Sequence, residues 1–129
     1  MPTKKRVRPT INDQGLLDLL EMGTITVDLN TADVFKRGEL LTATIVGKDG
    51  KNGTRYRLEI YHQERRRTIV RSRLVYMAGT MQLIPDKHEI HHLNGDRYDD
   101  RWANLICVSI RDHLKIHAME TEEDDEVPF

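Results

Sequence analysis

Histidines cluster in one short segment of this 129-residue chain, and that clustering constrains its fold more than any other feature. Five of the six histidines lie between residues 88 and 117. His91 and His92 are adjacent, and His113 and His117 lie four residues apart. Imidazole is the commonest metal ligand, and it exchanges protons near neutral pH. The segment Ile84–His117 is therefore predicted to hold a metal site, a proton-transfer site, or both.

The local pattern of this segment predicts two strands joined by a long loop. Glu89–His91 reads as the end of a short strand, and Leu105–Val108 is an apolar, partly β-branched run typical of a second strand. The link Leu93–Ala103 is polar and contains the turn signal Asn94-Gly95-Asp96. A connection of this length is often functional.

A helix is expected to follow the second strand. Ser109 with Asp112 three residues later resembles a capping box, which would start a helix near Ile110. Residues four apart share one face of a helix, so His113 and His117 could reach the same metal ion. The predicted order is strand, long loop, strand, helix.

This layout suggests hydrolytic chemistry. A metal held by His91, His113 and His117 would leave one coordination position open, as catalytic sites do. His92 would lie beside it as a base, and a metal with an adjacent base suits hydrolysis of a phosphodiester. Neighbours in a strand point to opposite faces, so spacing alone leaves open which of His91 and His92 faces the helix.

The same residues resemble a known family. His-His, Asn-Gly-Asp, Asp-Arg-Trp-Ala-Asn-Leu and the His113–His117 pair follow the pattern of the HNH endonucleases, whose core is the ββα-metal fold. The resemblance implies that His92 is the general base and that Asn104 pins the long loop. It implies that His91 and His113 bind the metal, with His117 completing a three-histidine site as in the colicin-type branch.

The resemblance also implies an outcome and a cofactor. Glu89 matches an acidic position two residues before the histidine pair and would support the metal site. The expected activity is metal-dependent cleavage of DNA, by nicking or double-strand cutting, leaving 5′-phosphate and 3′-hydroxyl ends. One divalent metal ion is expected, and three imidazoles suit zinc, nickel, cobalt or manganese better than magnesium.

Three other interpretations remain open. The chain could be a non-cleaving DNA-binding or phage packaging-accessory protein on the same fold, or a structural zinc module in which Cys107 is a fourth ligand. A lone cysteine in an apolar run is more often a buried small hydrophobe. Within the nuclease class, the sequence does not separate a DNase from an RNase.

The charge distribution favours double-stranded DNA as the partner. The formal net charge is −1, but six acidic residues lie in Glu120–Glu126, and without them 20 basic residues stand against 15 acidic ones. We expect an acidic, disordered tail over residues 120–129 and a basic arm over residues 1–10. Basic side chains neutralise phosphates and place a duplex without reading its sequence. The expected DNA contacts are Arg65, Arg66, Arg67, Arg71 and Arg73.

The fold class is expected to be α+β, with a β-rich support region over residues 11–80 and a ββα-metal core over residues 81–119. In the support region we expect helices at Gln14–Met22, capped by Asn12-Asp13, and at Arg71–Ala78. The expected strands are Thr24–Leu29, Leu40–Val46, Tyr56–Tyr61 and Thr68–Val70, the middle two flanking a Gly-rich hairpin turn.

Cellular context is also suggested by the sequence. No run approaches the roughly 20 apolar residues of a membrane span, and one cysteine fits a reducing compartment. We therefore expect a cytoplasmic protein, in the host cytoplasm if it is phage-encoded, acting as a monomer or homodimer without a membrane partner.

Overall fold

The first helix is fixed at both ends by its own sequence. The computed structural model of the chain describes residues 9–46 and 54–111, and α1 spans Asp13–Met22. Asn12 Oδ1 accepts a hydrogen bond from the backbone N–H of Gly15 at 2.8 Å, and Gly23 follows the last turn with a φ of 81°. An amide N-cap and a left-handed glycine are the usual helix boundaries, so the predicted helix is confirmed.

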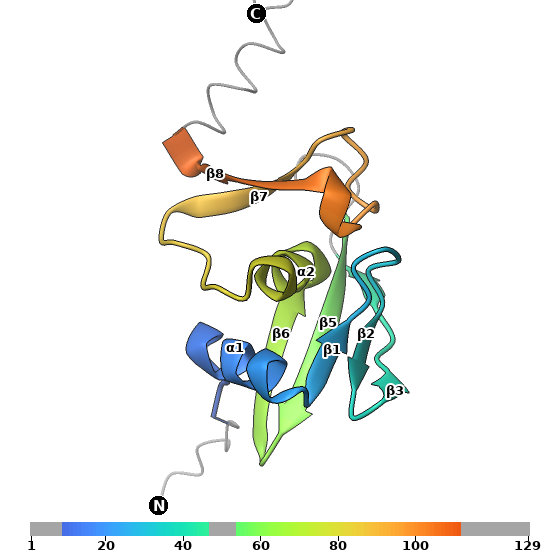
Figure 1. The fold of residues 1–129 in the computed structure, drawn as a ribbon, viewed down its shortest axis with the longest axis vertical. Coiled ribbons are helices and arrows are strands. Elements are labelled where there is room, and N and C mark those ends of the chain that lie inside the picture. Colours follow the sequence, from blue (N-terminus) through green and yellow to red (C-terminus); the bar gives the residue numbers. More distant parts are fainter. Residues whose placement is uncertain (1–8, 47–53, 112–129) are drawn as a thin grey trace, which may run out of the picture.

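Two three-stranded antiparallel sheets carry the N-terminal part of the chain (Figure 1). The first has the order β1-β2-β3, with strands Ile25–Val27, Val34–Lys36 and Glu39–Leu40. The second has the order β4-β5-β6, with strands Thr44–Val46, Arg55–His62 and Arg65–Val70. The expected strand Leu40–Val46 is wrong as one element, because Leu40 pairs with Phe35 in the first sheet while Thr44–Val46 pairs with β5.

The hairpin between β5 and β6 turns on two residues that the sequence did not mark. Gln63 and Glu64 both have positive φ, 51° and 65°. Positive φ at both central positions is what a tight two-residue hairpin requires, although Asn-Gly is the usual sequence for it. As a result β6 begins at Arg65 and is longer than the predicted Thr68–Val70 strand. The Gly-rich turn expected at 48–53 lies outside the described residues.

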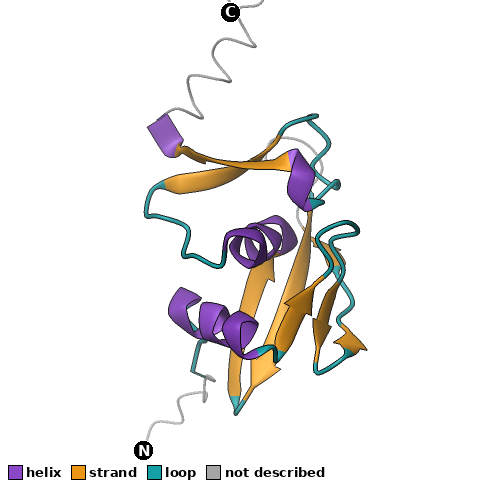
Figure 2. Ribbon diagram, in the orientation of Figure 1, coloured by secondary structure: helices purple, strands orange, loops and turns teal. Residues whose placement is uncertain are grey.

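Helix α2 (Arg71–Thr80) lies at the centre of the fold. Figures 1 and 2 show it between the β5–β6 pair and a hairpin of β7 (His88–His92) and β8 (Leu105–Ser109). Its side chains Leu74, Val75 and Met77 are fully buried. Because α2 contacts strands on both sides, it joins the N-terminal sheets and the histidine hairpin into one packed unit.

One apolar core continues from the first helix to the histidine hairpin. Ile84, Ile90 and Leu105 belong to the same buried cluster as Leu16 and Leu58. A short 3₁₀ turn, η1 (Trp102–Asn104), precedes β8, and the Trp102 backbone N–H donates to the carbonyl of Leu29 at 3.0 Å. The hairpin is therefore fastened to the N-terminal part by both packing and a backbone hydrogen bond.

The architecture confirms the α+β expectation, with β sheets followed by a ββα-like region. Ile110 and Arg111 are helical after β8, as the Ser109 pattern predicts, and the rest of that expected helix lies outside the described residues. Within the described ranges, no helix is long and apolar enough to cross a membrane.

Candidate active site

The two adjacent histidines point to opposite faces of the β7–β8 hairpin. His92 pairs with Leu105 and His91 with Ile106. His92 is buried with Ile90 on the face toward α2, whereas His91 is half-buried and Ile106 exposed on the opposite face. Strand alternation thus places the two rings on opposite sides of the hairpin, while residues 112–117, which carry His113 and His117, lie outside the described residues.

Asn104 holds the two ends of the long loop together. Its Oδ1 accepts from the backbone N–H of Asn94 at 3.0 Å, and its Nδ2 donates to Asn94 Oδ1 at 3.0 Å and to the Asp99 carbonyl at 2.9 Å. Its own carbonyl accepts from the Leu93 N–H at 2.8 Å. Asn104 is buried, so these bonds form away from water and fix the loop directly beside His92.

A carboxylate that the sequence did not single out contacts the His92 ring. Asp100 Oδ1 lies 2.7 Å from His92 Nε2, and Asp100 Oδ2 accepts from Arg71 Nε at 3.0 Å. Asp100 is 2% exposed, which makes it one of the most buried polar residues described. Its only sequence signal is its place in the Asp99-Asp100-Arg101 part of the motif, and nothing in the sequence distinguishes it from the adjacent Asp99.

Arg71 is held from the other side by aromatic residues. The guanidinium carbon lies 4.3 Å from the centroid of the Tyr56 ring, and Nη2 donates to the Tyr98 carbonyl at 3.4 Å. The Tyr56 and Tyr98 rings meet edge to face at 5.5 Å, and the Tyr98 hydroxyl is hydrogen-bonded to the hydroxyl of Thr54. Strand β5, helix α2 and the long loop therefore converge on one largely buried cation.

The described part of the chain contains some, but not all, of the expected metal ligands. His91 lies on the outer face of β7, whereas Glu89, two residues earlier, lines a hollow toward α2. His113 and His117 lie outside the described residues, and no group of three or more His, Cys, Asp or Glu side chains within residues 9–46 and 54–111 is arranged to hold a metal ion. Imidazole and carboxylate donors together suit a divalent transition metal.

Cys107 lies away from this outer face. It pairs with Ile90 in the hairpin and packs against the apolar core. Burial raises the pKa of the Cys107 thiol, which disfavours the thiolate form that binds metals. These properties are those of a small buried hydrophobe.

The five arginines expected to contact DNA occupy different settings. Arg65 and Arg66 are exposed at the end of the β5–β6 hairpin that lies far from β7 and β8 (Figure 1). Arg67 donates to the carbonyl of Ile11 and to Asp13 Oδ1, at 2.9 and 2.7 Å. Arg71 is paired with the buried Asp100, and Arg73 donates to the His88 carbonyl at 3.4 Å. Three of the five thus pair with carboxylates of the protein itself, Arg66 with Glu59 only at a long 4.0 Å on the surface.

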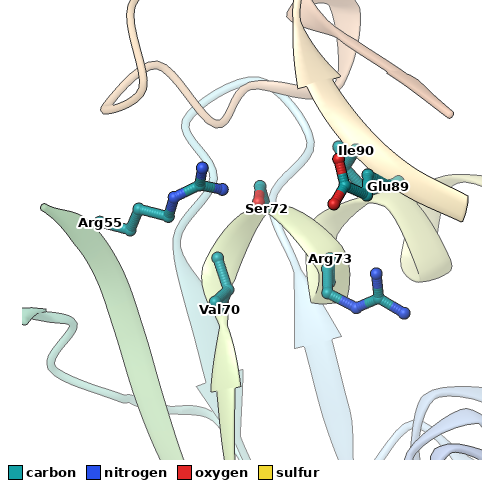
Figure 3. Close-up of a pocket in the computed structure, with 6 residues that line it drawn as sticks. All are labelled: Arg55, Val70, Ser72, Arg73, Glu89 and Ile90. Carbon is teal, nitrogen blue, oxygen red and sulfur yellow. The ribbon is translucent and has the colours of Figure 1, made fainter. Parts of the chain in front are cut away.

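A hollow of about 200 Å³ lies between the start of α2 and β7 (Figure 3). The guanidinium groups of Arg55 and Arg73 flank it, and Glu89 reaches its rim from β7. Arg55 is brought beside the start of α2 because Arg57, two residues later on β5, pairs with Val70 at the end of β6.

Two comparisons with known proteins found similarity. Residues 72–115 match the model of a family described as HNH endonuclease. The structure resembles a solved chain described as "DNA binding and cleavage by the HNH homing endonuclease I-HmuI", with a TM-score of 0.58 and 18% sequence identity. The similarity covers 83% of this chain and 56% of that chain, so this protein spans little more than half the length of that structure. No curated protein sequence matched.

The family match coincides with the segment that carries the site geometry. It begins at Ser72 in α2 and extends through β7, the long loop and β8. The structural resemblance extends the likeness in fold to most of the chain, including the β sheets ahead of that segment.

Proposed function

We propose that this protein is a metal-dependent HNH endonuclease that hydrolyses phosphodiester bonds of double-stranded DNA. The observation that carries the proposal is that the family match covers the hairpin in which Asn104 pins the loop beside a buried, hydrogen-bonded His92. Cleavage by nicking or double-strand cutting, with 5′-phosphate and 3′-hydroxyl ends, is the activity tested below.

In this proposal His92 is the general base. It accepts a proton from water while the water oxygen forms a bond to phosphorus and the bond from phosphorus to the 3′ oxygen breaks. The departing 3′ oxygen takes up a proton from solvent. Asn104 takes no part in proton transfer or bond cleavage. Its hydrogen bonds hold the loop in a fixed position relative to the end of β7.

A divalent metal ion would be bound by His91 together with His113 and His117, and Glu89 would support the site. Such an ion offsets negative charge on the phosphate and the leaving oxygen. Zinc, manganese, nickel and magnesium are the ions to compare, with the nitrogen-rich donor set favouring the transition metals.

The exposed face of the β4-β5-β6 sheet offers a path for the duplex. Arg55, Arg57 and Arg66 are exposed and share this face, because Arg66 pairs with Tyr61, which alternates outward along β5 with Arg55 and Arg57. They would contact several phosphates along this face, whereas Arg65 pairs with His62 on the face toward α1 and Arg73 lies on α2. Arg67 and Arg71 contribute mainly through their internal ion pairs.

The deciding experiment is a cleavage matrix of substrates against metals. Supercoiled plasmid, linear duplex and structured RNA are each incubated with Zn²⁺, Mn²⁺, Ni²⁺ or Mg²⁺, and the products are end-labelled. We expect metal-dependent nicking of plasmid and loss of at least about 100-fold in rate for His92→Ala. His88→Ala is the matched control, since His88 lies on the same strand and its Nδ1 is hydrogen-bonded to the Asp86 carbonyl. Equal activity of wild type and His92→Ala would remove His92 from the mechanism.

The burial of His92 favours one alternative function. A ring that is 8% exposed and bonded to a carboxylate can serve as a structural element. The chain would then be a DNA-binding or packaging-accessory protein on the same fold. In that case it would bind duplex DNA in a salt-dependent manner and leave every substrate in the matrix intact.

A further inference from the structure

We propose that Asp100 is a positioning residue for His92 and that Arg71, reaching across from α2, holds Asp100 in place. This inference rests on the proposed endonuclease function and concerns how its base is oriented. The arrangement presents His92 Nδ1, rather than Nε2, as the ring nitrogen that receives the proton.

The hydrogen-bond pattern assigns the two ring nitrogens. Asp100 Oδ2 accepts from Arg71 Nε at 3.0 Å, and a guanidinium can only donate. The other carboxylate oxygen lies 2.7 Å from His92 Nε2, and beside the Arg71 charge we infer that it accepts the hydrogen of that nitrogen. In neutral imidazole the other nitrogen then carries the lone pair. Among the described residues, none is hydrogen-bonded to His92 Nδ1.

Burial makes this arrangement stiff. The side chains of Arg71, Asp100 and His92 are 14%, 2% and 9% exposed. A buried charge without a partner is strongly destabilising, so the carboxylate and the guanidinium are held together. The Tyr56 ring against the guanidinium and the Tyr98 carbonyl on Nη2 limit the directions in which Arg71 can move.

Two residues outside the histidine hairpin, Arg71 and Tyr56, thereby take part in the site. Arg71 lies 29 residues before Asp100, and Tyr56 is on β5 in the N-terminal part of the chain. An orienting carboxylate behind a catalytic histidine fixes its tautomer, and its loss can lower turnover by several orders of magnitude. The β-rich region would thus control the reactivity of His92 as well as support its fold.

The test begins with the tautomer of His92 in the metal-free full-length protein. Nitrogen-15 NMR of histidine-labelled protein at fixed pH should show His92 protonated at Nε2 in the wild type. Asp100→Asn keeps the shape of the side chain but presents an amide, so we expect the tautomer signal to change. Asp86→Asn, at an exposed aspartate ahead of β7, is the control and should leave the His92 signal unchanged. Arg71→Lys, which keeps the charge without the planar fork, should give an intermediate change if Asp100→Asn proves too unstable to measure.

Kinetics supply the second readout. With plasmid or duplex DNA, Asp100→Asn should lower kcat by about 10-fold or more while KM changes little, because Asp100 touches neither phosphate nor metal. An unchanged His92 tautomer in both variants overturns the proposal, and so does a changed tautomer with wild-type kcat. If the wild type cleaves nothing, the endonuclease function fails, and the NMR result alone decides whether Asp100 and Arg71 set the tautomer of His92.

Discussion

Asn104 and Asn94 bond to each other through their side chains and through the Asn94 backbone, across the two ends of the loop between β7 and β8. Ten residues separate them in sequence. A polar loop of this length gains little from its own apolar contacts, so such hydrogen bonds hold its shape. The loop carries Asp100 at its far end, and its shape therefore determines where that carboxylate meets His92.

Replacing Asn104 with alanine should loosen this loop. The change removes three side-chain hydrogen bonds and leaves the Asn94 N–H and the Asp99 carbonyl without these partners, which should lower the free energy of unfolding by about 1–3 kcal/mol. Chemical denaturation monitored by circular dichroism measures the loss. Asn30→Ala, at an exposed turn position, is the control and should change stability by less than about 0.5 kcal/mol. Equal stability of the two variants would show that the loop is held by other contacts.

Gly79 is required by the position of Trp102. A Cβ added at Gly79 would lie 2.2 Å from Trp102 Cε3, well inside any tolerable contact. Alanine is ordinarily favoured over glycine within a helix by up to about 1 kcal/mol. Here we expect the opposite sign, a loss of about 1–3 kcal/mol for Gly79→Ala, because the indole cannot withdraw without disturbing η1.

A double-mutant cycle isolates this contact. Trp102→Leu removes the ring that a Cβ at position 79 would strike, so Gly79→Ala should be tolerated better in the Trp102→Leu background. Thermal unfolding of the four proteins gives the coupling energy. Strictly additive effects would mean that α2 and η1 can separate freely.

Arg65 and Arg66 provide a test of the DNA path that is independent of cleavage. Both are exposed at the end of the β5–β6 hairpin, about 17 Å from the start of α2 at the usual rise per strand residue. If both contact phosphates, Arg65→Gln with Arg66→Gln should weaken duplex binding and reduce the slope of log Kobs against log salt by about 2.

The lysine pair is the matched control for that measurement. Arg65→Lys with Arg66→Lys keeps both charges, so the slope should stay near the wild-type value. Fluorescence anisotropy with a labelled duplex over a range of salt concentrations gives all three slopes. A glutamine pair with the wild-type slope would place the duplex elsewhere on the surface.

The pH dependence of the loop should follow from Asp99. Its hydrogen bonds with the Arg101 side chain, aided by the Arg101 backbone N–H and the Asn94 amide, hold the pKa of Asp99 well below its usual range. Because the folded-state pKa is lowered, the stabilisation is complete above the ordinary carboxyl value of about 4 and is lost as the pH falls below it. Carbon-13 NMR of the carboxyl groups should show Asp99 titrating later than exposed aspartates during acidification. Arg101→Gln should move that titration back toward the ordinary value.

The sequence predicted much of the local structure because the signals were local. Asn12 and Gly23 mark the ends of α1, and alternating or β-branched runs mark β5, β7 and β8. Where pairing partners decide the outcome, local signals failed. Leu40 and Ile45 are largely exposed, so their burial pattern did not show that Leu40 belongs to one sheet and Thr44–Val46 to another.

The sequence by itself determined which residue types would meet in the β7–loop–β8 segment. The number of residues between His92 and Asn104 limits how far apart they can lie. Strand alternation requires the adjacent His91 and His92 to face opposite ways. Only the tertiary structure decided which face each histidine takes, because that depends on the side of the hairpin that packs on α2. It also selected Asp100 over the adjacent Asp99 as the partner of His92, since only Asp100 points into the buried space where Arg71 supplies a compensating charge.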